Sequence, residues 1–336
     1  MTELRQNMIT QDWVIIASER AKRPHEFTQK RDETVVIPVY RSDCPFCRGN
    51  EHLTGPECFR LNEGTGWRVR SVINRFSALS PTGEQVRRVE GIYRSLSGFG
   101  FHEVIIEHPR HDLTIALLGL EDVANILRVY QCRYHSIKLD SRMKAIIIFK
   151  NHGKGAGTSL EHPHSQLAAT PIVPYQLRLR TQEAIRYLDD MGECLFCRTL
   201  QEELKANERI IFETEHFVAF IPYAALSPFH IWIFPRRHCS SFDQITEEEI
   251  LDLAYNLKTV LAKLYYGLNN PDYNYTIRSS PTDQESTDYF HWYLAIIPRV
   301  SLAAGFEMGS GMFINTAFPE ESADFLRSVQ IPEFNS

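Results

Sequence analysis

Two histidines, His162 and His164, lie two residues apart in the segment Glu-His-Pro-His-Ser-Gln that spans residues 161–166. An imidazole ring can ligate a metal ion or attack an electrophile as a nucleophile. The pair therefore predicts a site at which one histidine binds metal while its neighbour does the chemistry.

The residues around this pair favour the handling of phosphate. The apolar run 143–149 predicts a buried strand, and the loop at 150–159 that follows it contains Gly153, Gly155 and Gly157. Glycines let backbone N–H groups approach an anion closely, although a flexible turn is the alternative interpretation. Gln166 adds an amide donor, and the run 167–171 continues as a strand to a proline.

Four of the seven cysteines form two pairs with identical spacing, Cys44 with Cys47 and Cys194 with Cys197. Two thiolates at this spacing can bind one Zn²⁺ from the same side and leave two positions for other ligands. A redox dithiol is the competing interpretation, but that motif typically opens a helix after a strand, and neither pair lies in such a pattern. We expect zinc.

The order of landmarks predicts that the chain contains one unit twice, and we call the units copy one and copy two. Each copy runs from a cysteine pair through an Ala-Leu-Ser-Pro segment, a strand ending near a histidine, a helix and a second histidine. The distance in sequence from the cysteine pair to the first histidine is longer in copy one than in copy two, and an insertion near residues 50–100 would explain this difference. This order predicts two closed tetrahedral zinc sites, formed by Cys44, Cys47, His111 and His162 and by Cys194, Cys197, His238 and His291. His108 and His230 are rival ligands.

The copies differ two residues after the last predicted ligand, where copy one has His164 and copy two has Tyr293. A phenol with a pKa of about 10 is a poor nucleophile at neutral pH, whereas a neutral imidazole is available. Copy one is therefore predicted to be catalytic, and copy two to be a structural unit that retains its metal.

With these motifs, the chain resembles the galactose-1-phosphate uridylyltransferase family of the histidine-triad superfamily over nearly its whole length. The landmarks are the segments at 20–24, 44–47, 151–166 and 305–308, together with Asn74. The resemblance implies an α+β fold of two fused histidine-triad-like domains, each an antiparallel sheet with helices, at residues 1–175 and 190–336. Amphipathic patterns predict helices at about 120–138, 174–191 and 246–266, and the stretch from Pro171 to about residue 192 predicts a linker.

The resemblance also implies a ping-pong nucleotidyl transfer. His164 would attack the α-phosphorus of a nucleotide sugar and expel a sugar 1-phosphate, and an acceptor phosphate would then take the nucleotidyl group. Gln166 would hold a phosphate oxygen, with Ser159 as a further catalytic donor. Further substrate contacts are implied at Arg20, Arg23, Asn74, Asn151, Ser165 and Glu307.

Departures from the family pattern bear on which substrate the chain recognises. This chain has Asn74-Arg75 where many relatives have Asn-Asp, and Ser301-Leu302-Ala303-Ala304 where they are basic and aromatic. The run 304–311 looks closer to the plant ADP-glucose phosphorylase branch, in which inorganic phosphate is the acceptor. The expected function is transfer to a sugar 1-phosphate in galactose metabolism, the alternative is adenylyl transfer to phosphate, and the second alternative is a non-catalytic zinc-stabilised nucleotide-binding protein.

Composition argues against nucleic acid and membranes as binding partners. The net charge of −6 argues against a nucleic-acid groove, and the cluster Arg178-Leu179-Arg180 is expected to be a solvated helix face. No apolar run reaches the ~18 residues of a membrane span, and no signal peptide is recognised. Unpaired Cys58, Cys132 and Cys239 fit a reducing compartment, which predicts a cytoplasmic protein. The resemblance implies a homodimer.

Overall fold

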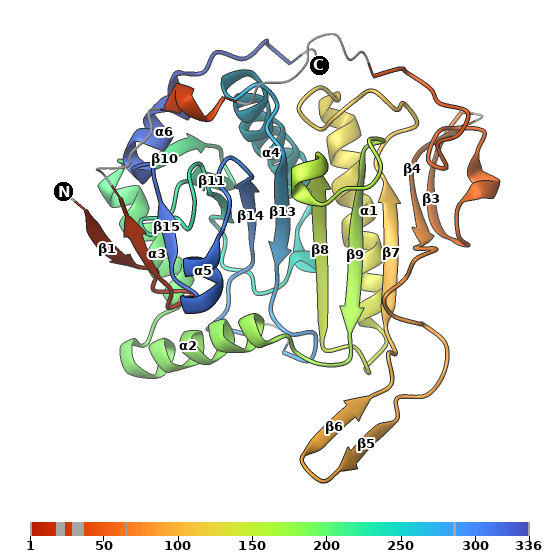
Figure 1. The fold of residues 1–336 in the computed structure, drawn as a ribbon, viewed down its shortest axis with the longest axis horizontal. Helices are drawn as coiled ribbons and strands as arrows, with labels where there is room; N and C mark the ends of the chain where they lie inside the picture. The colour runs from red at the N-terminus through yellow and green to blue at the C-terminus, as the bar shows by residue number, and fades with distance from the viewer. Residues whose placement is uncertain (1, 18–23, 29–36, 65, 285–286, 335–336) are drawn as a thin grey trace.

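A ten-stranded antiparallel sheet forms the centre of the molecule (Figure 1). The computed structural model describes residues 2–17, 24–28, 37–64, 66–284 and 287–334. Across the sheet the strands are β10 (Ile210–Glu213), β11 (Phe217–Phe220), β12 (Ile231–Pro235), β14 (Tyr293–Pro298), β13 (Tyr273–Arg278), β8 (Ala145–His152), β9 (His164–Thr170), β7 (Phe101–Ile106), β4 (Gly66–Ile73) and β3 (Glu57–Glu63).

The strand order shows the internal repeat directly. From the central pair outward, β8, β9, β7, β4 and β3 of copy one mirror β13, β14, β12, β11 and β10 of copy two. The two copies therefore share one continuous sheet through the pairing of β8 with β13. The predicted α+β class with antiparallel sheets is confirmed.

One helix from each copy covers the same face of this sheet, α1 (Leu120–Lys138) and α4 (Glu247–Gly267) (Figure 1). Helix α4 begins with a capping box, in which the Thr246 hydroxyl accepts from the Glu249 N–H and the Glu249 carboxylate accepts from the Thr246 N–H. This exchange satisfies two N–H groups that the helix itself leaves unpaired. The helices predicted at 120–138 and 246–266 are confirmed.

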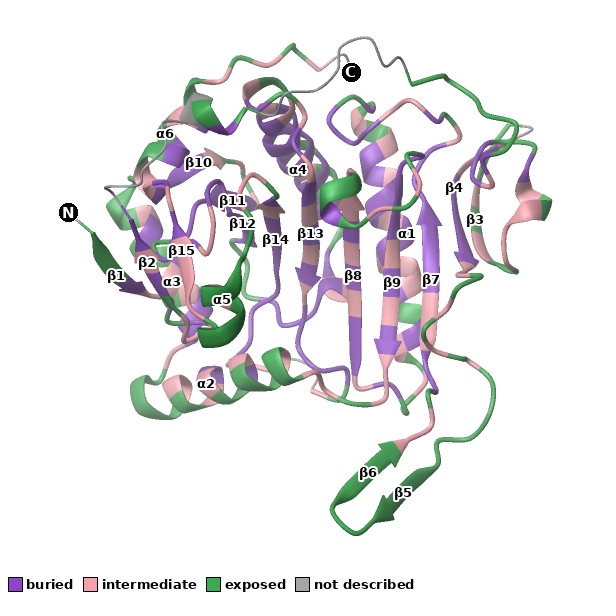
Figure 2. Cartoon of the chain, viewed as in Figure 1, coloured by how far each residue is buried: buried purple, intermediate pink, exposed green. Residues whose placement is uncertain are grey.

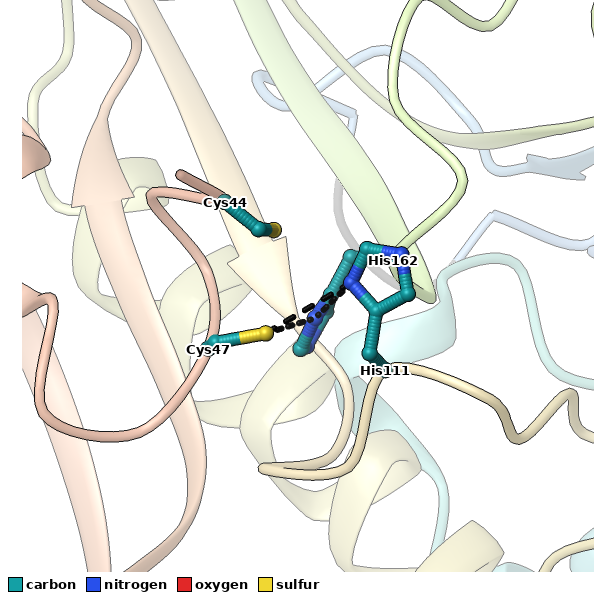
Figure 3. A group of neighbouring side chains, drawn as sticks. All are labelled: Cys44, Cys47, His111 and His162. Atoms are coloured by element: carbon teal, nitrogen blue, oxygen red, sulfur yellow. Dashed lines mark hydrogen bonds between the residues drawn. The ribbon is translucent and has the colours of Figure 1, made fainter. Parts of the chain in front are cut away.

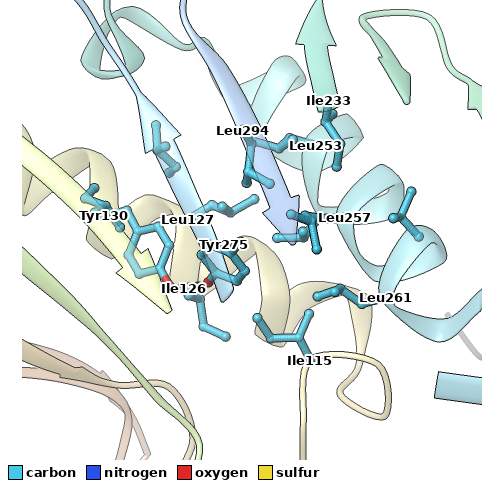
Figure 4. Packing of buried hydrophobic residues seen from close by; sticks show 14 of the residues in the cluster. Ile115, Ile126, Leu127, Tyr130, Ile233, Leu253, Leu257, Leu261, Tyr275 and Leu294 are labelled. Carbon is cyan, nitrogen blue, oxygen red and sulfur yellow. Dashed lines mark hydrogen bonds between the residues drawn. The ribbon is translucent and has the colours of Figure 1, made fainter. Parts of the chain in front are cut away.

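The main hydrophobic core lies between these two helices and the sheet (Figures 2 and 4). Leu127 of α1, Leu257 of α4 and Leu294 of β14 are almost fully buried in it. Each such side chain stabilises the fold by roughly 1.5–3 kcal/mol relative to exposure. The hydroxyls of Tyr130 and Tyr275 lie 2.6 Å apart within the core, so each buried phenol has a polar partner.

Smaller elements surround the sheet. A three-stranded sheet contains β1 (Glu3–Gln6), β2 (Trp13–Ile16) and β15 (Phe313–Asn315), and the exposed hairpin of β5 (Arg87–Glu90) and β6 (Tyr93–Leu96) projects from the body where an insertion was predicted (Figure 1). The predicted linker contains a helix, α2. The remaining elements are α2 (Tyr175–Met191), α3 (Leu195–Ala206), α5 (Gly305–Ser310), α6 (Pro319–Ser328), η2 (Pro24–Phe27), η3 (Glu51–Leu53), η4 (Lys154–Ala156) and η5 (Phe242–Gln244). None of the helices in the described part of the chain is long and apolar enough to cross a bilayer.

Candidate active site and metal clusters

His164 is the first residue of β9, and one of its ring nitrogens is already engaged. Its Nδ1 lies 2.8 Å from the carbonyl oxygen of His162, and a carbonyl can only accept, so Nδ1 carries the proton. The Nε2 lone pair is left for a reacting partner. Burial lowers the pKa of His164, which keeps the ring neutral at physiological pH.

Two cavities meet at His164. One, of about 450 Å³, has mainly apolar walls that include Phe46, Leu53, Val72, Phe76 and Val104. The other, of about 370 Å³, has polar walls that include Lys150, Asn151, His152, Lys154 and Asp272. His164, Ser159 and Leu160 line both cavities, so the ring stands where an apolar compartment joins a polar one.

Gln166 lies two residues along β9 from His164 and lines the apolar cavity. Its Oε1 is 2.9 Å from Nε2 of His102 on β7. The Ala78 N–H donates to Nδ1 of His102 at 3.2 Å, so Nε2 of that ring carries the proton and donates to Gln166. The Gln166 amide nitrogen then remains a donor for a ligand. Sequence analysis missed His102, because only the pairing of β7 with β9 brings it beside Gln166.

Asn74 belongs to the same group of polar side chains. It lines the apolar cavity with His164, and its Oδ1 accepts from the Phe76 N–H at 2.9 Å. Its Nδ2 lies 3.2 Å from Nε2 of His102, which cannot accept from it because this atom carries the proton donated to Gln166. Arg75 also lines this cavity and donates to the Leu53 carbonyl. The structure thus places Asn74 and Gln166 in the same cavity as His164, the predicted nucleophile.

A buried polar network supports the backbone of His164. Lys150 on β8 donates to the His164 carbonyl oxygen at 3.0 Å and to Glu107 at 2.5 Å. The Ser165 hydroxyl accepts from Tyr130 of α1 at 2.6 Å and is fully buried. The structure does not bring the predicted substrate contact Ser165 to the cavities at His164, because alternation along β9 points its side chain into the core.

The glycine loop after β8 already holds an anionic group. The Gly155 N–H donates to the Asp272 carboxylate at 2.6 Å, and a Cβ on Gly153 would collide with that carboxylate. Gly153 has a φ of +83°, a conformation that favours glycine. The anion that these glycines accommodate is thus a side chain of the protein itself. Asn151 lines the polar cavity and accepts from Asn274 at 2.8 Å.

Three further predicted contacts fall outside this geometry. Arg20 and Arg23 lie outside the described residues. Glu307 lies on exposed helix α5, where its carboxylate accepts from the Ala304 N–H, and it lines neither cavity at His164. The structure of one chain does not bring Glu307 to His164.

The first predicted ligand set forms a compact cluster (Figure 3). The donor atoms of Cys44, Cys47, His111 and His162 all lie within 4.8 Å of one another, and all four residues are buried. His162 Nε2 lies 2.8 Å from the His108 carbonyl, so Nδ1 presents its lone pair toward Cys47 at 3.6 Å. Such an outer hydrogen bond is the usual way to fix a metal-binding histidine.

The protonation preferences of this cluster fit the binding of a cation. Burial raises the pKa of the Cys44 thiol to about 11 and lowers the pKa of His162 to about 3. The thiol therefore stays protonated unless a positive charge stabilises the thiolate, and the imidazole stays neutral, as a ligand must.

The second cluster is looser. The donor atoms of Cys194, Cys197 and His238 lie within 4.8 Å of one another, and His291 does not belong to that group although its Nδ1 is 3.3 Å from Cys197. His238 is oriented by a contact of its Nε2 with the Thr287 carbonyl at 3.0 Å. Cys194 caps α3, so this pair does open a helix, but the element before it is helix α2 and not a strand.

The rival ligands are turned away from both clusters. His108 Nδ1 accepts from the Arg110 N–H, and its Nε2 lies 3.9 Å from Asp122. Buried His230 accepts from the indole N–H of Trp232 at 3.1 Å. The structure thus favours His111 and His238 over these two.

Comparison with known proteins agrees with this geometry. The profile of the N-terminal domain of galactose-1-phosphate uridyl transferase matches residues 1–174, and that of its C-terminal domain matches residues 180–330. An ADP-glucose phosphorylase of Arabidopsis thaliana is 37% identical over 98% of this chain and 93% of its own length. A galactose-1-phosphate uridylyltransferase of Thermotoga maritima is 28% identical over 98% and 99%.

Solved structures show the same two groups of relatives. An Arabidopsis thaliana ADP-glucose phosphorylase with bound ADP-glucose superposes with a TM-score of 0.84 at 34% identity, covering 99% of this chain and all of its own. A uridylyltransferase mutant superposes with a TM-score of 0.76 at 26% identity, covering 98% of each chain.

Proposed function

Because this chain belongs to the galactose-1-phosphate uridyl transferase family and is a nucleotidyltransferase, we propose that it transfers a nucleoside monophosphate through a covalent intermediate on His164. One observation carries this proposal. The Nδ1 contact with the His162 carbonyl leaves a neutral imidazole whose Nε2 is free, at the junction of two cavities.

The proposed reaction consists of two displacements. In the first, Nε2 of His164 bonds to the α-phosphorus of a nucleotide sugar, and the bond from that phosphorus to the bridging oxygen breaks, so a sugar 1-phosphate leaves. In the second, a phosphate oxygen of the acceptor bonds to the same phosphorus and the P–N bond breaks. The imidazole thus divides one difficult displacement into two easier ones.

The proposed roles of the neighbouring side chains follow from where they lie. The Gln166 amide nitrogen and the Ser159 hydroxyl would donate to the non-bridging oxygens, whose charge must be stabilised during transfer. The base would occupy the apolar cavity beside Phe46 and Asn74, and the sugar and its phosphate the polar cavity beside Lys154. Asn151 would contact the ligand from the same polar wall.

The two clusters would hold Zn²⁺, for which cysteine and histidine are the preferred ligands. At the first cluster, the metal would join the loop at Cys44 to His162, whose carbonyl orients the His164 ring. At the second, it would stabilise copy two. In this scheme zinc supplies structure, and the protein's own side chains supply the transfer chemistry.

Two substrate pairs are candidates. ADP-glucose with inorganic phosphate is favoured by the 37% identity with the Arabidopsis enzyme. UDP-glucose with galactose 1-phosphate is the second, favoured by the family descriptions and by the Thermotoga relative. Assaying both pairs with wild-type protein and with His164→Ala tests the proposal. Turnover of one pair that the variant lacks supports it, and binding without turnover by the wild type would identify a non-catalytic nucleotide-binding protein.

We further propose a homodimer in the cytoplasm. Glu307 is half-buried on α5 and lines neither cavity at His164 of its own chain, which fits a site completed by a second copy. All seven cysteines are free thiols, which fits a reducing compartment. Light scattering of the purified chain would measure the oligomeric state.

A further inference from the structure

A further, small cavity, of about 30 Å³, lies in copy two beside helix α2. Two arginines reach it from different elements, Arg180 from α2 and Arg278 from the end of β13, and Tyr293 of β14 lines the same space. Sequence analysis placed Arg180 on a solvated helix face. That expectation holds only in part for this residue, which is half-buried and whose Nε is shielded from solvent.

The cavity occupies the position that the catalytic site holds in copy one. Arg278 pairs across the sheet with Tyr293, and continuing the register of β8 and β9 places Asn151 opposite His164 in the same way. The pairing of β7 with β9 in copy one and of β12 with β14 in copy two shows which other residues of the two copies correspond. The corresponding pairs are Tyr293 and His164, Ala295 and Gln166, Arg278 and Asn151, and His230 and His102. Copy two has thus replaced a nucleophile and an amide by a phenol and a cation.

The charges in this cavity are not balanced by the protein. The Nε atoms of Arg180 and Arg278 are buried without a hydrogen-bond partner, and among the described residues neither side chain forms an ion pair. No acidic side chain is among the residues that line the cavity. Burial and the proximity of Arg180 lower the pKa of Arg278 to about 10, so the Arg278 guanidinium still carries its charge at neutral pH.

We infer that this cavity binds one small inorganic oxyanion, of the phosphate or sulfate class, between Arg180 and Arg278. Two neighbouring cations, each with a buried Nε that lacks a partner and with no acidic side chain beside them, are costly, and an anion between them lowers that cost. Guanidinium groups match the geometry of oxyanions in particular. A water needs about 10–15 Å³ and a drug-sized ligand several hundred, so the cavity admits a small ion and excludes a nucleotide.

The test measures the melting temperature of four proteins in sodium sulfate and in sodium chloride at matched ionic strength. The proteins are the wild type and the variants Arg180→Gln, Arg278→Gln and Arg178→Gln, the last being an exposed arginine on the same helix. We expect sulfate to raise the melting temperature of the wild type and of Arg178→Gln by several degrees more than chloride does. The two cavity variants should lose this difference while keeping wild-type nucleotidyl transfer.

Because sulfate can also enter the catalytic site, the comparison between variants is the deciding one. An equal sulfate effect in all four proteins would overturn the inference, as would an equal effect of chloride and sulfate on the wild type. The direction of the stability change in anion-free buffer is a second test. Removing an unpaired buried charge should leave Arg278→Gln at least as stable as the wild type there, and a large loss of stability would show that the arginine has a protein partner instead.

Discussion

The carbonyl oxygen of His162 lies 2.8 Å from the Nδ1 atom of His164, so the predicted metal ligand and the predicted nucleophile are directly connected. The His162 ring faces Cys47 while its backbone fixes the tautomer of the next histidine. Substitutions in the first cysteine–histidine cluster should therefore reduce the rate of nucleotidyl transfer, whereas substitutions in the second should not.

Replacing the nucleophile should separate chemistry from metal binding. His164→Ala should reduce nucleotidyl exchange by about three orders of magnitude or more, because the covalent route is lost. Its zinc content, measured by mass spectrometry of the metal, should equal that of the wild type. Loss of one zinc equivalent would instead show that His164 is a ligand.

The orientation of the Gln166 amide should depend on His102. In His102→Leu the donor to Oε1 is gone, so the amide can rotate, and we expect kcat to fall about 10- to 100-fold with a smaller change in KM. Gln166→Ala combined with His102→Leu should be little worse than Gln166→Ala alone. Additive losses in the double variant would mean that His102 acts independently of the amide.

The buried pair of Lys150 and Glu107 should be costly to break from one side. Lys150→Met leaves the Glu107 carboxylate buried without its cation, which should lower the free energy of unfolding by about 3–5 kcal/mol. Denaturant titration measures this loss. Adding Glu107→Gln to that variant removes the uncompensated charge and should recover part of the stability; if nothing is recovered, the pair is not the cause.

Metal removal should affect the two clusters differently. Cys47→Ser and Cys194→Ser should each lose a zinc equivalent and each lower the melting temperature, since metal binding stabilises the fold. Only Cys47→Ser should also reduce kcat in the protein that remains folded. An unchanged melting temperature in Cys194→Ser would show that the second cluster is not structural.

The local spacing of residues in the sequence predicted much of the candidate site. The remainder depends on how distant strands pair, which only the structure shows. The cysteine pairs, the proximity of His111 and His162 to the first pair, and the repeat could be predicted because each is a local motif or a recurring order of motifs. The link of His102 to Gln166 could not, since it depends on the register of β7 against β9. The burial of Ser165 follows from strand alternation, but only once the strand is known to begin at His164.

The arginine cavity was missed for a similar reason. Arg180 lies in a helix whose pattern is amphipathic and largely exposed, and nothing local shows that its side chain meets Arg278 from β13. The packing of α2 against copy two is long-range in sequence, and it makes a residue of a largely exposed helix line a small cavity beside a second arginine.

The central claim is tested most directly by the mass of the protein after brief mixing with ADP-glucose or UDP-glucose without an acceptor. We predict a mass increase of one nucleoside monophosphate, located at His164 by peptide mapping, lost on addition of phosphate or galactose 1-phosphate, and absent from His164→Ala. A protein that turns over either substrate pair without forming this adduct, or that carries it on another residue, would contradict the account.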